Sequence, residues 1–322
     1  MLRTPQTIAV LITSVGSAGA QCVIKTLRKQ KQYPVKIFGC DSDEYNAGKF
    51  LVDTFHKVPH ASAVDFLSTL QGICKLENIN LLIPIMDQEI LAVAEHAKDF
   101  QPYHPIISPL KTVVLCLDKY ACQQRVEKIP NIRCPQLFSS LQDATLPVII
   151  KPRKGTGSKG MRVIRKKNST QEKIDPGCII QEFIDGMEYS VDAYVSANRN
   201  FIACIPRRRI EVKNGLAVKT LIVEHPILIE SSTTILRALG IIGPANLQFI
   251  QDKQGTIYFL EINPRFGGAY IASVEAGLKS PLYLLNELRG DPIKYKGYRR
   301  AMVMLRYWEE IYTHTTDANP MD

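Results

Sequence analysis

The ten residues FLEINPRFGG, at positions 259–268, are the stretch that decides the fold. They predict a β-strand that ends at Pro264, because proline cannot donate a hydrogen bond to a neighbouring strand. Side chains alternate along a strand, so Glu261 and Asn263 share one face while the apolar residues beside them share the other. A carboxylate and an amide followed by Arg265 suit Mg²⁺ and a phosphate group, and the two glycines allow a turn or a close approach to a ligand. The alternative is a solvent-facing edge strand with a turn.

The residues before this strand predict its partner. Residues 246–263, NLQFIQDKQGTIYFLEIN, predict a hairpin that turns at residues 252–255. In that register Gln248 lies on the same face as Glu261, one diagonal step away. With Asn263, three oxygen-bearing side chains then converge. Since Mg²⁺ takes one or two carboxylates and completes its shell with water and phosphates, this set suits a metal that arrives with a nucleotide.

A glycine-rich stretch lies upstream, at residues 147–164, PVIIKPRKGTGSKGMRVI. Lys151 ends a buried strand, and Gly155, Gly157 and Gly160 follow before the next strand. Backbone N–H groups of such a loop can cradle phosphate oxygens, and the lysines add positive charge. The loop joins two strands and not a strand to a helix, so it is not a Walker A loop. The alternative is a flexible basic hairpin.

Two further stretches carry polar side chains with a less specific pattern. Residues 179–190, IIQEFIDGMEYS, can offer backbone hydrogen bonds to an adenine edge, and Glu188 can accept from ribose hydroxyls, although acids beside a glycine turn are usually solvated. On the strand that follows, Arg207, Arg209 and Glu211 alternate and so share one face. With Lys219 they could neutralise a phosphate or hold a carboxylate, and a solvated charged face is an equal alternative.

The order of the predicted elements indicates two kinds of sheet. Strands within 7–13, 35–43, 55–61 and 80–90 alternate with helical patterns, which predicts a parallel, doubly wound sheet over about the first hundred residues. From residue 147 onward, strands follow one another at close spacing, which predicts antiparallel sheet. Later elements are predicted as a helix at 232–239, a single helix at 273–290 and a last strand at 300–308. The fold class is therefore α/β followed by α+β.

Candidate ligand-binding residues also occur in the predicted parallel sheet. Gly16, Asp41, Asp87 and Glu89 lie at or near the carboxyl ends of its strands, where open α/β sheets bind ligands. Alternatively, Asp41 begins a turn and Asp87 caps a helix.

Composition limits the class of protein. The 322 residues are 45% hydrophobic and 22% charged, as in an ordinary globular protein, and the net charge of +9 favours anionic ligands. Zinc-finger spacing and an RRM signature are absent, so we expect no nucleic-acid partner. The eight cysteines contain no CxxC pair, and no apolar run has the length of a membrane span or a signal peptide. We expect a cytoplasmic protein that does not bind a membrane.

Three of these stretches occur together in one family. In their order and spacing, residues 147–164, 179–194 and 246–268 closely resemble ATP-grasp enzymes of the carbamoyl-phosphate-synthase and biotin-carboxylase type. The resemblance covers roughly residues 110–310, and the segment before it is similar to the Rossmann-like domain that precedes this fold. It implies a Rossmann-like domain at 1–110 and an ATP-grasp domain at 111–322, with a mobile antiparallel lid at about 135–185.

The resemblance also implies roles for individual residues. Nucleotide contacts are implied for Lys119 and Lys151, for a phosphate loop of Gly155, Gly157, Ser158, Gly160 and Met161, for an adenine hinge of Gln181, Glu182, Phe183 and Ile184, and for Glu188 at the ribose. Metal ligation is implied for Gln248, Glu261 and Asn263, with Gln248 also near the nucleotide. Charge stabilisation during catalysis is implied for Arg265 and Lys151, and we add Arg209, on the charged face of its strand, as a further catalytic candidate. Position 248 is often a glutamate in the family, so the glutamine leaves the number of metal ions open.

The function implied is an ATP-dependent ligase that joins a carboxylate to an amine or similar nucleophile through an acyl phosphate. Its cofactors would be ATP and Mg²⁺, with Mn²⁺ as an alternative metal. Its partners would be small-molecule or peptide carboxylates and amines, and a homodimer is one assembly that we consider. One alternative is an NAD(P)-dependent oxidoreductase, because VGSAGA after a strand imitates a dinucleotide fingerprint, although the spacing is GxxG. Another is a nucleotide-binding sensor without turnover.

Overall fold

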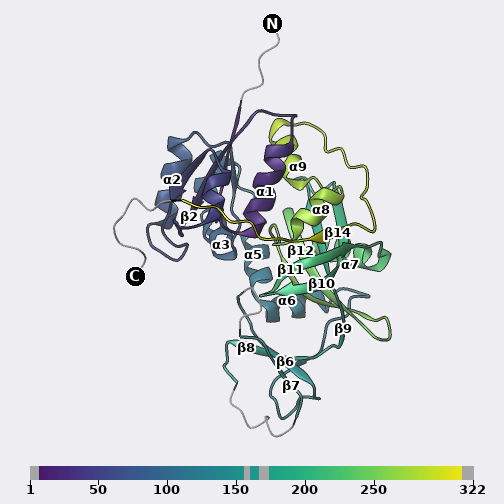
Figure 1. The fold of residues 1–322 in the computed structure, drawn as a ribbon. Coiled ribbons are helices and arrows are strands. Elements are labelled where there is room, and N and C mark those ends of the chain that lie inside the picture. The colour runs from purple at the N-terminus through teal and green to yellow at the C-terminus, as the bar shows by residue number, and fades with distance from the viewer. Residues whose placement is uncertain (1–6, 156–159, 167–173, 314–322) are drawn as a thin grey trace.

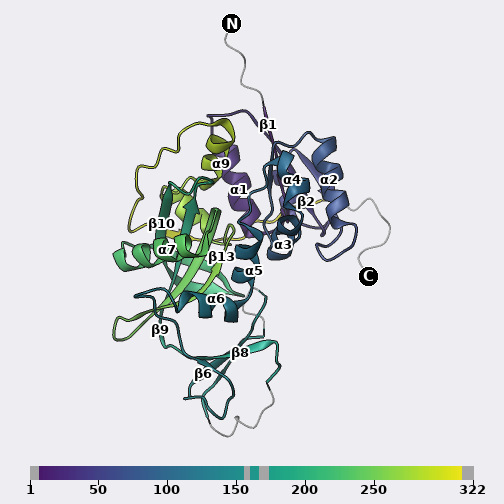
Figure 2. The same ribbon diagram turned by 180° about the vertical axis from the view of Figure 1, so that it is seen from behind.

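The computed structural model describes residues 7–155, 160–166 and 174–313. Over these residues the chain forms a parallel four-stranded sheet, a six-stranded antiparallel sheet and a smaller four-stranded antiparallel sheet, as Figures 1 and 2 show from opposite sides. The predicted combination of a parallel-sheet N-terminal unit with antiparallel sheets is confirmed.

The helices have these bounds: α1 Ala18–Lys29, α2 Phe66–Leu76, α3 Asp87–Glu95, α4 Ala97–Phe100, α5 Leu110–Leu117, α6 Lys119–Val126, α7 Pro226–Leu239, α8 Tyr270–Ala276 and α9 Ser280–Arg289, with short 3₁₀ turns η1 Ala47–Leu51 and η2 Gln101–Tyr103. The strands are β1 Ile8–Ile12, β2 Val35–Asp41, β3 Thr54–Lys57, β4 Leu81–Ile83, β5 Leu137–Phe138, β6 Val148–Pro152, β7 Arg162–Ile164, β8 Cys178–Glu182, β9 Gly186–Val195, β10 Ile202–Lys213, β11 Leu216–Ile222, β12 Gly243–Asp252, β13 Ile257–Asn263 and β14 Val303–Leu305.

The N-terminal sheet has the strand order β3-β2-β1-β4, with every pair parallel. β1 lies between two neighbours and is covered on both faces, which explains its unbroken apolar sequence. The chain then turns into α1, where the Ser17 Oγ accepts a hydrogen bond from the Ala20 N–H at 3.2 Å. This cap satisfies one of the free amides of the first turn and fixes where the helix begins.

The six-stranded sheet has the order β13-β12-β9-β10-β11-β14 and carries helices on both faces. On one face, Leu228, Ile235 and Leu236 of α7 belong to a buried cluster with Val191 and Leu247 of the sheet. α8 lies on the other face, where Tyr270 donates a hydrogen bond to the Ala193 carbonyl at 2.7 Å. The sheet is therefore a rigid platform between two layers.

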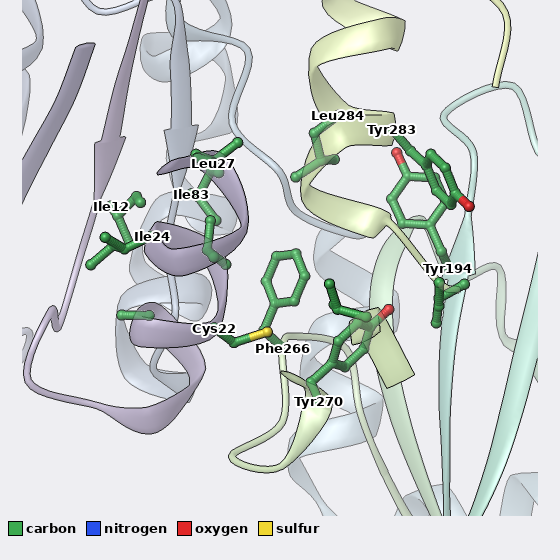
Figure 3. Close-up of a cluster of buried hydrophobic side chains, with 14 of the residues drawn as sticks. Ile12, Cys22, Ile24, Leu27, Ile83, Tyr194, Phe266, Tyr270, Tyr283 and Leu284 are labelled. Atoms are coloured by element: carbon green, nitrogen blue, oxygen red, sulfur yellow. The ribbon is translucent and has the colours of Figure 1, made fainter. Parts of the chain in front are cut away.

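One hydrophobic core joins the N-terminal sheet to the six-stranded sheet. Figure 3 shows α1 beside α8 and α9, with side chains of all three helices directed into one cluster. Its labelled members are Ile12, Cys22, Ile24, Leu27, Ile83, Tyr194, Phe266, Tyr270, Tyr283 and Leu284. Since this core crosses the boundary between the predicted domains, the two units pack as one body.

Three elements differ from the sequence-based expectation. The helix expected at 273–290 is split into α8 and α9 at Gly277, whose φ of +144° is outside the helical range. A Cβ at Gly277 would lie 2.5 Å from the Gly297 carbonyl oxygen, so the backbones touch there. The helix expected at 232–239 begins six residues earlier, at Pro226, since proline is well suited to a first helical turn. The last strand shortens to Val303–Leu305, which is the part that pairs with β11.

The smaller antiparallel sheet has the order β5-β8-β6-β7 and its own buried cluster of Leu141, Val148, Ile150, Ile164 and Ile180. It lies at the end of the molecule away from the N-terminal sheet (Figure 1). The lid predicted at about 135–185 contains this sheet, and its motion, like the domain bounds at 110 and 111, stays a prediction.

All eight cysteines are free thiols, and six of them are buried. Within the described residues, no helix combines the length and the hydropathy that crossing a bilayer requires.

Candidate active site

A cleft of about 480 Å³ opens between the six-stranded sheet, the end of β6 and the beginning of α1. It brings together residues that lie far apart in the sequence. The predicted site residues that line it are Lys119, Lys151, Gly155, Met161, Glu188, Arg209, Gln248, Glu261, Asn263 and Arg265. Most of the residues expected to handle phosphate, metal and reaction intermediate therefore share one cavity.

The metal-binding face predicted on the β12–β13 hairpin lies in this cleft. Gln248 is directly opposite Glu261 and not one diagonal step away as expected. The register differs because the strands pair Gln251 with Ile257 beyond the turn and because a bulge follows Gln248. Direct pairing brings the two side chains closer together than a diagonal would. Asn263 also lines the cleft, and its Nδ2 donates to the Glu261 Oε1 at 3.3 Å.

Two lysines face the Glu261 carboxylate. Lys151, at the end of β6, is only 6% exposed. Burial lowers its pKa from the usual 10.5, although the negative charge of Glu261 acts in the opposite direction. The Lys119 Nζ lies 4.0 Å from the Glu261 Oε2 and donates to the Gly155 carbonyl at 2.6 Å. One carboxylate beside two ammonium groups leaves positive charge available for phosphate.

Arg209 reaches the predicted metal-binding face from β10. Its Nη1 donates to the Gln248 Oε1 at 2.9 Å and its Nη2 donates to the Gly215 carbonyl at 3.0 Å. The Nε lies 3.4 Å from the Glu188 Oε2, which is half exposed. Burial lowers the pKa of Arg209, and the Glu188 carboxylate opposes this effect. The guanidinium is thus a largely desolvated cation held beside a neutral amide.

Arg265 connects the predicted metal-binding face to the N-terminal domain. Its Nε donates to the Asp87 Oδ1 at 2.6 Å, and its Nη2 donates to the Asn263 Oδ1 at 3.4 Å. Both members of the ion pair are less than one-fifth exposed. Asp87 is the first residue of α3, so it does more than cap a helix: it holds an arginine of the cleft.

The other candidates in the N-terminal domain have internal partners. The Glu89 carboxylate is buried, which raises its pKa, while hydrogen bonds from the Thr13 Oγ1 and Ser14 Oγ oppose that effect. The Asp41 Oδ2 accepts from the Gly16 N–H at 2.9 Å. These contacts tie the loop after β1 to helix α3 and to the end of β2, which is a structural role.

Several predicted nucleotide contacts fall outside the cleft. Gly157 and Ser158 lie outside the described residues. Gly160 is exposed, with a φ of +74°, and is not among the residues that line the cleft. The hinge residues Gln181, Glu182, Phe183 and Ile184 do not line it either.

The hinge residues are instead bonded to the protein itself. The Gln181 Nε2 donates to the Gln123 Oε1 at 2.5 Å, and the Glu182 Oε2 accepts from the Gln136 N–H at 3.1 Å. The Phe183 N–H donates to the Pro147 carbonyl at 3.1 Å. Their role in binding adenine stays a prediction.

Two groups of cleft residues were not predicted. Asn246 lines the cleft beside Arg207, and the Asp192 carboxylate bonds to both of them. An acid inside the apolar strand YSVDAYV was the available signal, because a buried carboxylate requires partners. The start of α1 also lines the cleft, with its cap Ser17 and its first residues Ala18 and Gly19. Lys219 pairs with Glu211 at 2.6 Å on exposed surface, away from the residues of the cleft.

The donor set on the hairpin fits a nucleotide-borne Mg²⁺. Among the described residues, no three histidine, cysteine or acidic side chains gather into a cluster that could hold a metal alone. One carboxylate and two amide oxygens do face the same cleft, namely Glu261, Gln248 and Asn263. This is the sparse oxygen set that suits a magnesium ion completed by water and phosphate.

Comparison with known proteins agrees with this geometry. Residues 116–269 match the ATP-grasp domain family. The chain carries an ATP-grasp domain. Residues 10–105 match the family of PylC-like N-terminal domains, so a known type of N-terminal domain precedes the ATP-grasp domain. The family predicted from the three sequence stretches is confirmed.

Curated relatives cover parts of the chain. The large chain of carbamoyl phosphate synthase from Caldanaerobacter subterraneus subsp. tengcongensis is 30% identical over 176 residues, which are 48% of this chain and 16% of that protein. The vancomycin C-type resistance protein VanC1 of Enterococcus gallinarum is 26% identical over 187 residues, which are 48% of this chain and 54% of that protein. The chain thus spans about half of the second relative and much less of the first.

Solved structures share the fold of most of the chain. N5-carboxyaminoimidazole ribonucleotide synthetase from Thermotoga maritima superposes with a TM-score of 0.69 at 16% identity, over 90% of this chain and 78% of that one. Biotin carboxylase from Campylobacter jejuni superposes with a TM-score of 0.71 at 14% identity, over 89% and 72% of the two chains. The N-terminal domain and the ATP-grasp domain therefore follow a shared fold.

Proposed function

We propose that the protein is an ATP-dependent ligase that joins a carboxylate to an amine or a similar nucleophile. The observation that carries this proposal is the cleft, where Lys119, Lys151 and Arg265 surround the Glu261–Asn263 face of an ATP-grasp domain. Cations beside a metal-binding face are the equipment that phosphoryl transfer needs, since such catalysis consists of positioning and charge stabilisation. A protein nucleophile is not required.

The residues act at separate points of this reaction. Gln248, Glu261 and Asn263 would hold Mg²⁺, which when bound neutralises charge on the β- and γ-phosphates. Lys119 and Lys151 hold the terminal phosphates, and Glu188 and the stretch Gln181–Ile184 hold the nucleoside. A substrate carboxylate oxygen attacks the γ-phosphorus, and the bond to ADP breaks.

The second half of the reaction forms the product. The amine nitrogen attacks the carbonyl carbon of the acyl phosphate, the C–O bond to phosphate breaks, and the amine loses a proton. Arg265 and Arg209 stabilise the negative charge that develops on the transferred phosphoryl group and on the departing phosphate. Cytoplasmic location and a homodimer remain predictions.

The experiment measures phosphate release from ATP against a panel of carboxylates, each with and without amines, and identifies the spent nucleotide by chromatography. We expect ADP and phosphate, because the lysines and the metal-binding face share the cleft in which the terminal phosphates would lie. Accumulation of AMP would contradict the acyl phosphate. ATP·Mg²⁺ binding without phosphate release from any pair would instead favour a non-catalytic sensor, and stabilisation by NAD(P) alone in a thermal-shift assay would favour an oxidoreductase.

A further inference from the structure

Arg207 is a buried cation in the wall of the cleft with one end unpaired. Its side chain is 3% exposed, and its Nε and Nη2 donate to the two Asp192 oxygens at 2.8 and 3.3 Å. The Nη1 is enclosed and has no hydrogen-bond partner among the described residues. A buried donor without a partner destabilises the folded protein, and proteins retain few of them. The unpaired donor indicates that an acceptor comes from outside the chain.

Asp192 is arranged to hold Arg207 in place. In addition to the arginine, it accepts from the Asn246 Nδ2 at 2.6 Å and from the Ser273 Oγ at 2.7 Å. The carboxylate is completely buried and is bonded from β10, β12 and α8. Because the side-on pairing uses Nε and Nη2, the guanidinium is fixed with its Nη1 hydrogens left for another acceptor.

Glycines allow the elements around Arg207 to pack closely on one another. A Cβ at Gly267 would lie 3.1 Å from the Asn246 Cγ, so the loop after β13 packs directly on the residue that bonds Asp192. A Cβ at Gly19 would lie 3.0 Å from the Phe266 carbonyl oxygen, which places the start of α1 against the same loop. Ala18 and Gly19 line the cleft, and the amides of a first helical turn favour an anion.

Other arginines add positive charge at this end of the cleft. Arg209 follows two residues later on the same face of β10, and its Nε also has no hydrogen-bond partner in the described part of the chain. The Arg306 Nη2 donates to the Gly268 carbonyl at 2.7 Å. Burial lowers the pKa of both arginines, and the charge of Arg207 acts in the same direction. A bound anion would offset both the cost of burying these charges and the repulsion between them.

We propose that the end of the cleft formed by Arg207, the Gly267–Ala269 loop and the start of α1 binds a second anionic group of the substrate, a carboxylate or a phosphate. This inference rests on the proposed ligase function, in which the first carboxylate is the one that reacts. Lys119 and Lys151 face Glu261 at the metal-binding face, so the Arg207 end is available to the substrate. The substrate class is therefore a molecule with two anionic groups.

The test compares three ligands of matched length in the wild-type protein saturated with Mg·ADP. Butyrate carries one carboxylate, succinate carries two, and 3-phosphonopropionate carries a carboxylate and a phosphonate. Isothermal titration calorimetry should show that succinate or 3-phosphonopropionate binds at least about tenfold more tightly than butyrate, because the second anionic group accepts a charge-assisted hydrogen bond that butyrate cannot. The tighter of the two identifies the second group. Equal affinity for all three would overturn the inference.

Arg207→Lys tests the residue itself, because a lysine keeps a positive charge beside Asp192 but lacks the third nitrogen of the guanidinium. In this variant, the preference for succinate or 3-phosphonopropionate over butyrate should fall about tenfold. The affinity for Mg·ADP should stay within about twofold of the wild-type value. Arg208→Lys is the matched control, since Arg208 lies on the opposite face of β10 and outside the lining of the cleft. A variant that keeps the full preference would also overturn the inference.

The two proposals fail in different ways. If wild-type protein does not bind Mg·ADP, the ligase function is wrong and this inference loses its basis. If Mg·ADP binds and the anion preference is absent, only the second anionic site is wrong. The ligand series in the wild-type protein decides this even when Arg207→Lys does not fold, which circular dichroism would reveal.

Discussion

At the scale of single residues, Glu261 supplies the only carboxylate of the predicted metal-binding face, beside two neutral amides. Glu261→Gln keeps the size of the side chain and removes its charge. We expect ATP turnover to fall by about 100-fold or more, since charge stabilisation at the reacting phosphate is lost. The fold should persist because the side chain faces the cleft. Phosphate release and circular dichroism measure the two effects.

Glu211→Gln is the matched control for this change. Glu211 pairs with Lys219 on exposed strand surface, and surface ion pairs contribute little to stability. Turnover should therefore stay at the wild-type level. If Glu261→Gln also keeps wild-type turnover, or if both variants lose it equally, the assignment of the metal-binding face is wrong. Asn263→Ala should behave as Glu261→Gln does.

Lys151 should take up a proton when nucleotide binds. Burial lowers its pKa below 10.5, so its neutral form becomes populated as the pH rises toward that value. Phosphate oxygens beside the amine favour the charged form and raise the pKa again. Binding of a non-hydrolysable ATP analogue should thus consume protons, and increasingly so as the pH rises. Calorimetry in buffers of different ionisation enthalpy measures this uptake.

Lys151→Met removes the titrating group and serves as the control. The buffer dependence at alkaline pH should then disappear, and the affinity should fall. Proton uptake that is unchanged in Lys151→Met would assign the effect to another group, and its absence in the wild-type protein would place Lys151 away from the phosphates.

At the scale of elements, two glycines should respond to alanine with opposite signs. Gly277 separates α8 from α9 with a φ of +144°, and a Cβ there would meet the Gly297 carbonyl at 2.5 Å. Gly277→Ala should lower the free energy of unfolding by about 1–3 kcal/mol. Gly72 lies inside α2 with open space around it. Gly72→Ala should therefore raise the free energy of unfolding by about 0.5–1 kcal/mol. Urea denaturation of both variants and the wild-type protein measures these free energies.

The sign is the decisive result of this comparison. Equal effects of the two alanines would show that helix propensity, and not the backbone contact at Gly277, determines the outcome. A Gly277→Ala protein as stable as the wild type would show that α8 and α9 can join into the single helix that the sequence pattern indicated.

Hydrogen exchange tests whether the small sheet is a lid. Strands β5 to β8 form a sheet with a separate small core, so we expect them to open more readily than the six-stranded sheet. A bound ATP analogue should slow exchange at the end of β6, where Lys151 and Gly155 line the cleft. Strand β2, which contributes no residue to the cleft, supplies the internal control. Equal exchange with and without the analogue would contradict a lid.

The sequence patterns predicted which strands carry the site residues better than they predicted how those strands and side chains pair. Period-two alternation placed Glu261 and Asn263 on one face, because side-chain direction along a strand is a local property. The register of Gln248 was wrong because a bulge depends on contacts with β9 and β13 that no local pattern encodes. Arg207 was considered, but its pairing with Asp192 joins β10 to β9 and becomes visible only in three dimensions.

At the scale of the whole molecule, the core shared by α1, α8 and α9 should make unfolding cooperative. Leu284 of α9 is 2% exposed in the cluster of Figure 3. Leu284→Ala should cost about 2–5 kcal/mol, because it leaves a cavity at the junction of the two units. Hydrogen exchange at β1 should accelerate together with exchange at β9, since both lie against this core.

Val64→Ala is the control, because Val64 is fully exposed and its truncation should change the stability by less than about 0.5 kcal/mol. Acceleration confined to the six-stranded sheet in Leu284→Ala would contradict the single cooperative body. The shared core could not be inferred from the sequence, which suggested two separate folding units, because the apolar faces of α1 and α9 do not reveal which neighbour they meet.

The ion pair between Asp87 and Arg265 limits how the N-terminal domain can be exchanged between related ATP-grasp proteins. An N-terminal domain transplanted from a related enzyme would bring new side chains to the mouth of the cleft, and with them a new choice of substrate. The graft would work only if the donor domain supplied an acid at the first residue of its third helix. Without that acid, a guanidinium of the recipient would lose its counterion at the reacting centre. Exchange of specificity by domain shuffling is thus limited to donors that carry the matching half of this pair.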